Sequence, residues 1–538
     1  MKFRNAFGLL VLACAAQTPI TIVDLQQFRH TSKNSVATLV NLNPAVNVWF
    51  LLSSASGETW HLENPRPRET QILLDEKYPA GIIIAEGRNR HHCPLFESEL
   101  KAGRSAPLIY YPLCEGRVYL RNPAKGQRTA LEAATEFLRD QVWGGEKVIV
   151  LFHHLLADRY RDTGEAGGGR GNAGATNGPP AASIDPQYSA RSIVPDNLGI
   201  ETSQHSFSPG VWYPVTGNPS MFVSVIQPGL IAHEILQGFK ARVSNLDSVE
   251  STSICYLIAF DMDRYELGYA LGTQFPGVGW SGHMVPRMRD PKLPGPDGIG
   301  SIAPLVSTGL IAPDNGRRTV AAFTAGFKRT HGAFHSGELS LKNRGSHYGF
   351  IENGVVFSKL QPGVATVVVF NDGSLDMKTW AEGDDRLLSR VRHARQNGVP
   401  LVESEGTPGR FVANWGAGNW SGSEDAKLRT IRAGAAIANV HGKRFLIYAV
   451  FSDATPSAMA RVFQAYQCGY AMLMDMNALE HTYLAVYRRA GSEMAVDHLM
   501  KGMSVLDQSS GGQVVPRFLG YPDNRDFFYV MTRNEVKK

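Results

Sequence analysis

A glycine-rich segment divides this chain of 538 residues. Residues 161–183 read RDTGEAGGGRGNAGATNGPPAAS, with seven glycines, two prolines and no large apolar side chain. Such a segment buries too little apolar surface to offset the entropy lost on ordering, so it predicts a flexible linker, which we place at 161–185. The chain is also too long for one compact core. We therefore expect a domain on each side, at residues 21–160 and 190–535.

The composition indicates a globular, turn-rich protein. Hydrophobic residues make up 43% of the chain and charged residues 19%, with 54 glycines and 30 prolines. The formal net charge of +5 is small for this length, and the basic residues form no long block. Nucleic acid is therefore not expected as the main partner.

Residues 1–16 resemble an export signal. Two basic residues precede an apolar run from Ala6 to Ala13, and small residues follow it. The stretch VLAC at 11–14 is also similar to a bacterial lipobox, which predicts a lipid anchor through Cys14. One alternative is cleavage after Ala15 or Ala16. The other is that the segment is a buried N-terminal strand or helix. No later apolar run is long enough to span a bilayer, so we expect an exported protein that is periplasmic, a cell-envelope lipoprotein or secreted.

Export would allow the remaining cysteines to form disulfides. Four cysteines other than Cys14 permit three pairings. We favour a bridge between Cys93 and Cys114, because it closes the shortest loop and both residues flank predicted turns. Cys255 and Cys468 lie in apolar, strand-like sequence and are expected to be free, buried thiols. The chain has no CxxC pair, so nothing indicates a zinc finger or a thioredoxin-like site.

Short apolar runs separated by turn residues predict a mixed α+β protein. In the first domain these runs alternate and predict the strands of a β-rich, sandwich-like unit. Thr129 and Glu132 form a capping box, which predicts one helix after those strands. In the second domain, the turn signals at 353–354 (NG) and 371–373 (NDG) predict hairpins. We therefore expect a β-rich sandwich-like domain, a flexible linker and a C-terminal β-rich α/β domain.

A strand–helix–strand pattern covers residues 444–476. The apolar run RFLIYAVF predicts a buried strand, Thr455 and Pro456 predict the start of a helix, and YAMLMDM predicts the next strand. Short connections of this kind predict a right-handed crossover between parallel strands. Asp475 would then lie at the carboxyl end of a parallel strand, where open α/β sheets bind their ligands.

Four short motifs follow one another between residues 250 and 535. They are TAGFK at 324–328, Gly349 with the NG turn at 353–354, RAG at 432–434 and MDM at 474–476. In order and spacing they resemble the phosphodiester glycosidase family, that of the mannose 6-phosphate uncovering enzyme. The chain departs from the family at Thr324, where the family has asparagine. It also has MNALEH at 476–481 in place of a glycine-rich turn, a change that reshapes or closes the pocket.

The resemblance implies hydrolysis of a sugar 1-phosphodiester or a related cell-envelope glycan, with no cofactor required. Such a reaction passes through an oxocarbenium-like state that carboxylates stabilise, and cations hold the departing phosphate. We assign Asp475 as nucleophile or stabiliser and Glu480 as acid/base. Arg432, with its planar fork of donors, is assigned to the phosphate. His481 would orient a group or shuttle a proton.

Further residues are expected to bind the substrate, a glycan or sugar phosphate. They are Lys328, Gly326, His331, His335, Trp415, Trp420 and Asn477. The two tryptophans lie in a glycine-rich loop and suit stacking on a sugar ring. On a helix, His331, His335 and Glu338 could bind a metal, but three glycines between 326 and 337 argue against a helix, so no metal site is predicted.

Each of these residues also has an ordinary structural interpretation. Asp475 and Asn477 can stabilise a turn, Arg432 can pair with an acid at a strand edge, and tryptophans are often core residues. The alternative function is therefore a catalytically inactive envelope protein that binds glycan or another protein on the same fold.

Overall fold

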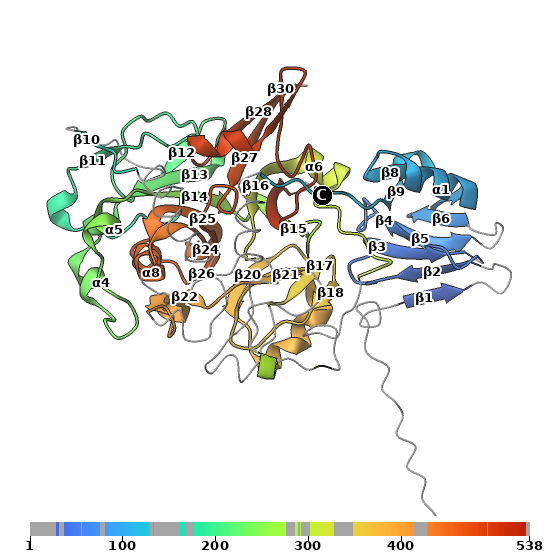
Figure 1. The fold of residues 1–538 in the computed structure, drawn as a ribbon, viewed down its shortest axis with the longest axis horizontal. Coiled ribbons are helices and arrows are strands. Elements are labelled where there is room, and N and C mark those ends of the chain that lie inside the picture. The colour runs from blue at the N-terminus through green and yellow to red at the C-terminus, as the bar shows by residue number, and fades with distance from the viewer. Residues whose placement is uncertain are drawn as a thin grey trace, which may run out of the picture.

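The computed structural model describes residues 28–31, 37–54, 56–75, 81–129, 133, 162–167, 177–275, 286–288, 291, 302–327, 348–413, 428–491 and 493–533. These residues are mostly β, with several antiparallel sheets and few helices (Figure 1). The expected mixed fold is therefore correct in its β-rich character and overstates the helical part.

The N-terminal part consists of two sheets with a shared core, at one end of the molecule in Figure 1. The first sheet has the strand order β1 (Phe28–Thr31), β2 (Thr38–Asn41), β3 (Trp49–Ser53), β4 (Thr59–Glu63), β9 (Val118–Arg121), β8 (Tyr110–Leu113). The second has the order β5 (Thr70–Asp75), β6 (Gly81–Glu86), β7 (Asn89–Cys93). Apolar side chains of both sheets and of helix α1 (Glu97–Ser105) pack together, as the alternating pattern predicts.

An eight-stranded sheet forms the centre of the rest of the molecule. Its strand order is β12 (Tyr213–Val215), β13 (Asn218–Ile226), β14 (Cys255–Asp261), β25 (Lys443–Ala454), β24 (Thr430–Val440), β26 (Tyr470–Met476), β22 (Pro400–Glu403), β23 (Thr407–Pro408). Both faces are covered, because its strands contribute apolar side chains to two separate core clusters. This explains why β14 and β26 are apolar at nearly every position instead of alternating.

Two five-stranded sheets and two small ones complete the described β structure. The first has the order β15 (Tyr265–Ala270), β31 (Phe527–Thr532), β16 (Thr319–Thr324), β27 (Leu484–Ala490), β28 (Glu493–His498). The second has the order β18 (Val355–Ser358), β17 (Phe350–Glu352), β21 (Val391–Gln396), β19 (Ala365–Phe370), β20 (Leu375–Thr379). The small sheets pair β10 (Glu165–Gly167) with β11 (Ser192–Val194), and β29 (Gln508–Ser510) with β30 (Gln513–Val515).

The described helices are short. The α-helices besides α1 are α4 (His233–Gln237), α5 (Ser248–Thr252), α6 (Pro313–Arg318) and α8 (Pro456–Ala465). The 3₁₀ helices are η2 (Cys114–Gly116), η3 (Pro186–Tyr188), η4 (Pro228–Leu230), η5 (Pro286–Met288), η6 (Glu382–Arg390), η7 (Ser404–Gly406) and η8 (Lys501–Leu506). No helix among the described residues is long and apolar enough to cross a membrane.

The predicted crossover at 444–476 is partly correct. Helix α8 begins at Pro456, and the Thr455 side chain caps it by accepting from the Ala458 amide at 3.3 Å. Strands β25 and β26 run in the same direction, but β24 lies between them and pairs antiparallel with both. The end of β26 therefore belongs to an antiparallel neighbourhood, and the rule for ligand sites in parallel sheets does not apply to Asp475.

The described ends of the predicted linker are packed against other parts of the chain. At the first end Asp162 is buried, and its carbonyl accepts from the Ile254 amide at 2.8 Å. At the second end the Ser183 amide donates to the Ala465 carbonyl at 2.9 Å, and Trp212 donates to the Pro180 carbonyl at 2.9 Å. Pairing with neighbouring backbone gives these residues the hydrogen bonds that their composition alone does not predict.

Two other sequence expectations are confirmed. Asn353 and Gly354, both with positive φ (49° and 75°), join β17 to β18 in a two-residue hairpin. Cys93 and Cys114 form a disulfide, whereas Cys255 and Cys468 are free and buried. The disulfide is consistent with an extracytoplasmic location. The predicted signal at 1–16, Cys14 and most of the predicted helix after Thr129 lie outside the described residues.

Candidate functional site

Asp475 lies near the end of β26, beside an irregularity in the sheet. The pairing of β26 with β24 shifts here, so three residue steps of β26 lie opposite two of β24. A β-bulge of this kind interrupts the strict alternation of side chains and re-aims the residues around it. The bulge thus sets where the Asp475 side chain points.

Asn397 fixes the backbone beside Asp475. Its Nδ2 donates to the carbonyls of Leu473 at 2.9 Å and Met474 at 3.0 Å, and its Oδ1 accepts from the Phe327 amide at 3.1 Å. Gly326 allows this approach, because a Cβ at its position would lie 2.8 Å from the Asn397 side chain. Gly326, predicted to contact substrate, therefore has a positioning role in the described structure.

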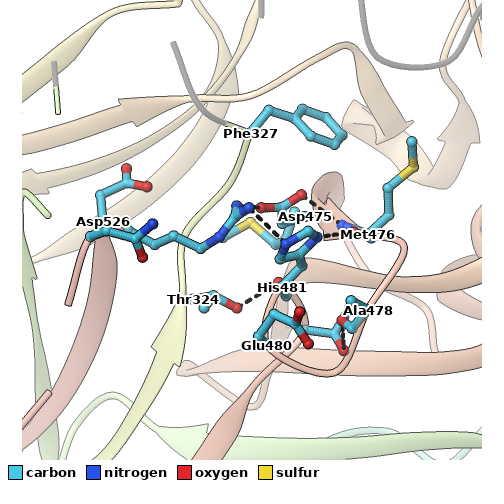
Figure 2. A network of polar contacts seen from close by, with 12 residues as sticks. Thr324, Phe327, Asp475, Met476, Ala478, Glu480, His481 and Asp526 are labelled. Carbon is cyan, nitrogen blue, oxygen red and sulfur yellow. Dashed lines mark hydrogen bonds and ion pairs between the residues drawn. The ribbon is translucent and has the colours of Figure 1, made fainter. Parts of the chain in front are cut away.

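Arg525 joins Asp475 to His481 (Figure 2). Its Nη1 donates to Asp475 Oδ2 at 2.5 Å, and its Nη2 lies 2.7 Å from His481 Nε2. Since a guanidinium can only donate, Nε2 accepts and the ring proton is on Nδ1, which donates to the Met476 carbonyl at 2.7 Å. Asp475, Arg525 and His481 therefore form one connected group, with the imidazole neutral.

Burial dominates the electrostatics of Asp475. Its residue is only 5% exposed, and burial raises the pKa of its carboxyl to about 6, while the charge of Arg525 acts in the opposite direction. Its Oδ1 accepts from the Met476 amide at 2.8 Å. The carboxyl can therefore exchange a proton close to neutral pH, which suits acid–base or nucleophilic chemistry.

A second buried ion pair lies next in the chain. Asp526 accepts from Arg395 Nε at 2.6 Å and from the Tyr269 hydroxyl at 2.7 Å. Arg395 Nη2 also donates to the Phe327 carbonyl at 2.6 Å. Burial raises the pKa of Asp526, with Arg395 acting against it. These bonds fix the start of β31 and hence the backbone that carries Arg525.

Thr324 holds the turn that carries His481. Its Oγ1 donates to the His481 carbonyl at 2.7 Å, as Figure 2 shows. At this position, the glycosidase family that the sequence motifs resemble has asparagine. A hydroxyl there is committed to the turn, so Thr324 supports the site from below the imidazole.

Arg432 is not the cation beside Asp475. It is fully buried, and its Nε and Nη2 each donate to a backbone carbonyl at 2.8 Å, of Ala454 and Leu428. Its Nη1 lies 2.7 Å from the Met476 sulfur. The guanidinium is thus engaged in internal contacts, and the phosphate role predicted for Arg432 has no support in the described structure.

Glu480 and Asn477 form hydrogen bonds with residues outside the group of Asp475, Arg525 and His481. Glu480 is 6% exposed, and its Oε1 accepts from the Thr129 hydroxyl at 3.3 Å. In Figure 2 it lies below His481, on the side away from Asp475. Asn477 has a φ of 81° and donates its amide to the Ile431 carbonyl at 2.9 Å, as expected of a turn residue.

Five predicted binding residues lie outside the described residues: Lys328, His331, His335, Trp415 and Trp420. Their predicted roles stay predictions. Phe327, the residue before the first of them, donates its amide to Asn397, which holds the backbone beside Asp475. Within the described ranges, no group of three or more His, Cys, Asp or Glu side chains is arranged to hold a metal ion.

Sequence reasoning missed Arg525. The only local signal is the cluster PDNRD at 522–526, four polar residues after a proline and directly before the apolar strand β31. Charged side chains at the entrance of a buried strand are unusual unless they are paired. That pattern could have marked the segment, but not its partner.

Comparison with known proteins gives only distant likenesses. No protein-family model and no curated protein sequence matches the chain. The catalytic domain of zebrafish N-acetylglucosamine-1-phosphodiester alpha-N-acetylglucosaminidase, auto-inhibited by its pro-peptide, is similar in structure at a TM-score of 0.31 and 10% identity, over 67% of this chain and 96% of that one.

Two further solved structures are similar at comparable levels. A hypothetical protein from Synechocystis has a TM-score of 0.25 and 11% identity, over 95% of this chain and 99% of that one. An exported protein from Burkholderia pseudomallei K96243 has a TM-score of 0.18 and 10% identity, over 52% and 74%. At these values the likeness is distant and assigns no function.

Proposed function

We propose that this protein is an exported hydrolase that releases a sugar from a sugar 1-phosphodiester or a related cell-envelope glycan. The observation that carries the proposal is the Arg525 guanidinium, which contacts the carboxylate of Asp475 and the imidazole of His481 at once. A carboxylate next to a cation is the minimum that this reaction needs. Asp475 is the group that faces the sugar, and Arg525 is the cation that faces the phosphate.

The chemistry follows from the charges. Positive charge develops on the sugar ring in an oxocarbenium-like state, and the ionised carboxylate of Asp475 stabilises it or attacks the anomeric carbon. The departing phosphodiester is already an anion, so it needs a cation more than a proton. Arg525 meets it through its planar fork of donors, and a ligand oxygen would take the place of one present contact.

The other predicted residues keep narrower roles. His481 orients Arg525 through its Nε2, and its protonated Nδ1 donates to the Met476 carbonyl. Glu480, predicted as the acid/base, is bound by Thr129 and shares no hydrogen-bond partner with Asp475 in the described structure. We therefore assign the role of catalytic carboxylate to Asp475 before Glu480.

Release of free sugar from defined phosphodiesters tests the proposal. The full chain is incubated with the methyl phosphodiester of N-acetylglucosamine 1-phosphate and with UDP-N-acetylglucosamine, and free sugar is measured. Asp475→Asn and Arg525→Gln should each lower the rate by about a hundredfold or more. The ion pair of Arg488 with Asp497, 2.7 Å apart and partly exposed on β27 and β28, supplies matched controls in Arg488→Gln and Asp497→Asn, which should keep the rate.

The pH profile gives a second check. If the ionised carboxylate acts, the rate should rise with pH through about 6, the pKa of Asp475. Absence of sugar release by the wild-type chain, or a rate that Asp475→Asn leaves unchanged, would contradict the enzyme assignment. Loss of activity on adding a chelator would instead favour a metal-dependent hydrolase that uses His331 and His335.

A binding protein without turnover is the alternative. It is favoured by the state of Asp475, whose two oxygens both accept hydrogen bonds and whose residue is 5% exposed. In that case glycan affinity is present without sugar release and survives Asp475→Asn. It should fall in Trp415→Ala or Trp420→Ala, since a stacked ring contributes about 1 kcal/mol or more.

A further inference from the structure

A cavity of about 720 Å³ lies between the N-terminal sheets and the β18–β17–β21–β19–β20 sheet. Residues of β2, β3, β5 and β6 form one wall, and the opposite side has Arg392 of β21 and Asn371 of the turn after β19. The volume is in the range of small-molecule sites. None of its lining residues belongs to the group of Asp475, Arg525 and His481.

Arg392 brings an unpaired cation to this cavity. The residue is partly exposed, and its side chain makes no hydrogen bond or ion pair with any residue in the part of the chain that the structure describes, with its Nε fully covered. The nearby carboxylate of Glu266 is bound by Arg318 at 2.8 Å and faces Arg68 at 3.7 Å. Burial lowers the pKa of Arg392, and the charges of Arg68 and Arg318 lower it further, against the opposing effects of Tyr529 and Glu266.

Asn371 adds an unpaired acceptor on the same wall. Its Oδ1 is buried and has no partner among the described residues. The amides on the facing wall are satisfied in a different way: Asn41 Nδ2 donates to Asn47 Oδ1 at 3.1 Å, and Asn47 Nδ2 donates to the Thr70 carbonyl at 2.7 Å. Buried polar groups usually find partners, so these two residues offer the cavity a charged donor and a polar acceptor for a ligand.

The polarity of these groups defines the ligand. A guanidinium pairs best with a carboxylate or phosphate, and an amide oxygen requires a donor such as a hydroxyl. Arg68, which also lines the cavity and is half exposed, adds a second positive charge at its rim. Leu73 of β5, which lines the cavity and is exposed, gives the facing wall apolar surface that suits the C–H face of a ring.

We propose that this cavity binds a sugar acid, with the carboxylate against Arg392 and Arg68 and a ring hydroxyl donating to Asn371. The site is independent of hydrolysis at Asp475. It would give the protein a second recognition element for acidic glycan, placed between the N-terminal sheets and the rest of the chain.

Calorimetric titration of the full chain with D-glucuronate, D-galacturonate, D-glucose and inorganic phosphate tests this. We expect saturable binding of at least one uronate, and at least tenfold weaker binding of glucose, because the charged hydrogen bond is lost. Arg392→Gln should weaken uronate binding at least tenfold, and Asn371→Asp should weaken it by repulsion. Arg386→Gln, which removes an exposed arginine of η6 outside the cavity, should leave binding unchanged.

The folding of the variant is checked separately. Removing an unpaired, partly buried charge should leave the melting temperature of Arg392→Gln equal to or above that of the wild type, so loss of binding would not reflect unfolding. Three results overturn the proposal: no saturable binding of either uronate, uronate binding that Arg392→Gln leaves unchanged, or phosphate bound as tightly as the uronates, which would indicate a simple anion site.

Discussion

Substituting Asp475 with asparagine should change how the stability of the protein depends on pH. The pKa of its carboxyl is about 6 in the folded chain, against 3.8 for an ordinary aspartate. This difference of about two pH units corresponds to about 3 kcal/mol, at 1.36 kcal/mol per unit. Burial is the cause, since the folded state favours the neutral carboxyl.

The sign follows from which state loses its proton first. Below pH 3.8 the carboxyl is protonated in both states, and its ionisation costs nothing. Between pH 3.8 and about 6 the unfolded chain ionises first, so the free energy of unfolding falls as pH rises. Above pH 6 the full loss of about 3 kcal/mol is present. Asparagine does not titrate, so Asp475→Asn lacks this loss.

Urea unfolding of the wild type and Asp475→Asn, measured from pH 4 to pH 8, gives the test. The free energy of unfolding of the wild type minus that of the variant should fall by roughly 2 to 3 kcal/mol between pH 4 and pH 7 and then stay level. The lost contact with Arg525 adds an offset that does not depend on pH, because arginine stays charged. Asp263→Asn, at an exposed turn position, controls for loss of a carboxylate elsewhere. A difference that is constant with pH, or that rises, would refute the reasoning.

Three further tests use substitutions elsewhere in the structure. Arg432→Ala should cost roughly 3 kcal/mol or more in urea unfolding, because it empties a fully buried position and removes the donors to the carbonyls of Ala454 and Leu428; a cost under about 1 kcal/mol would contradict this. Replacing Cys93 and Cys114 by serine should cost about 3 kcal/mol, as expected for a bridge across 21 residues, and reductant should have no further effect on that variant. Gly354→Ala should destabilise more than Gly217→Ala: both glycines have a φ of 75°, but only at 354 would the new Cβ clash with a side chain, that of Asn43. Equal melting temperatures of the two variants would show that this contact does not matter.

Local signals predicted the parts of the fold that local physics determines. The NG pair at 353–354 forms a hairpin because both residues tolerate positive φ. The cap and first turn of α8 follow from a threonine and a proline at adjacent positions. The Cys93–Cys114 bridge was found because the loop it closes is short and both ends lie at turns.

Strand order required information that the strand–helix–strand pattern does not contain. That pattern fixes the relative direction of β25 and β26, and their direction is as predicted. The pattern does not show that β24 lies between β25 and β26 and pairs with both. Strands β24 and β25 form a hairpin through the two-residue turn at His441 and Gly442, both with positive φ. Strand β24 therefore already occupies the position beside β25, and β26 pairs with the other edge of β24.

The candidate site was likewise predicted in part: the carboxylate was predicted correctly, and its cation was not. Asp475 was predicted from a strand end, and the structure puts it in a buried, charged position there. Its cation was predicted to be Arg432, which lies on the neighbouring strand and uses its donors on backbone carbonyls. The actual cation comes from the start of β31, 50 residues further along the chain.

The pairing of Arg525 with Asp475 depends on how two sheets pack together. β26 belongs to the eight-stranded sheet and β31 to a five-stranded sheet, and side chains of both enter the same core. Arg525 reaches Asp475 only because the two sheets pack against each other and because Arg395 and Asp526 fix the start of β31. A motif on one strand therefore identifies the carboxylate but not its charge state, since the pKa of Asp475 depends on burial between the sheets and on a guanidinium from the second one. Any variant that loosens this packing should change the pKa of Asp475 through burial and Arg525, even when it leaves β26 intact.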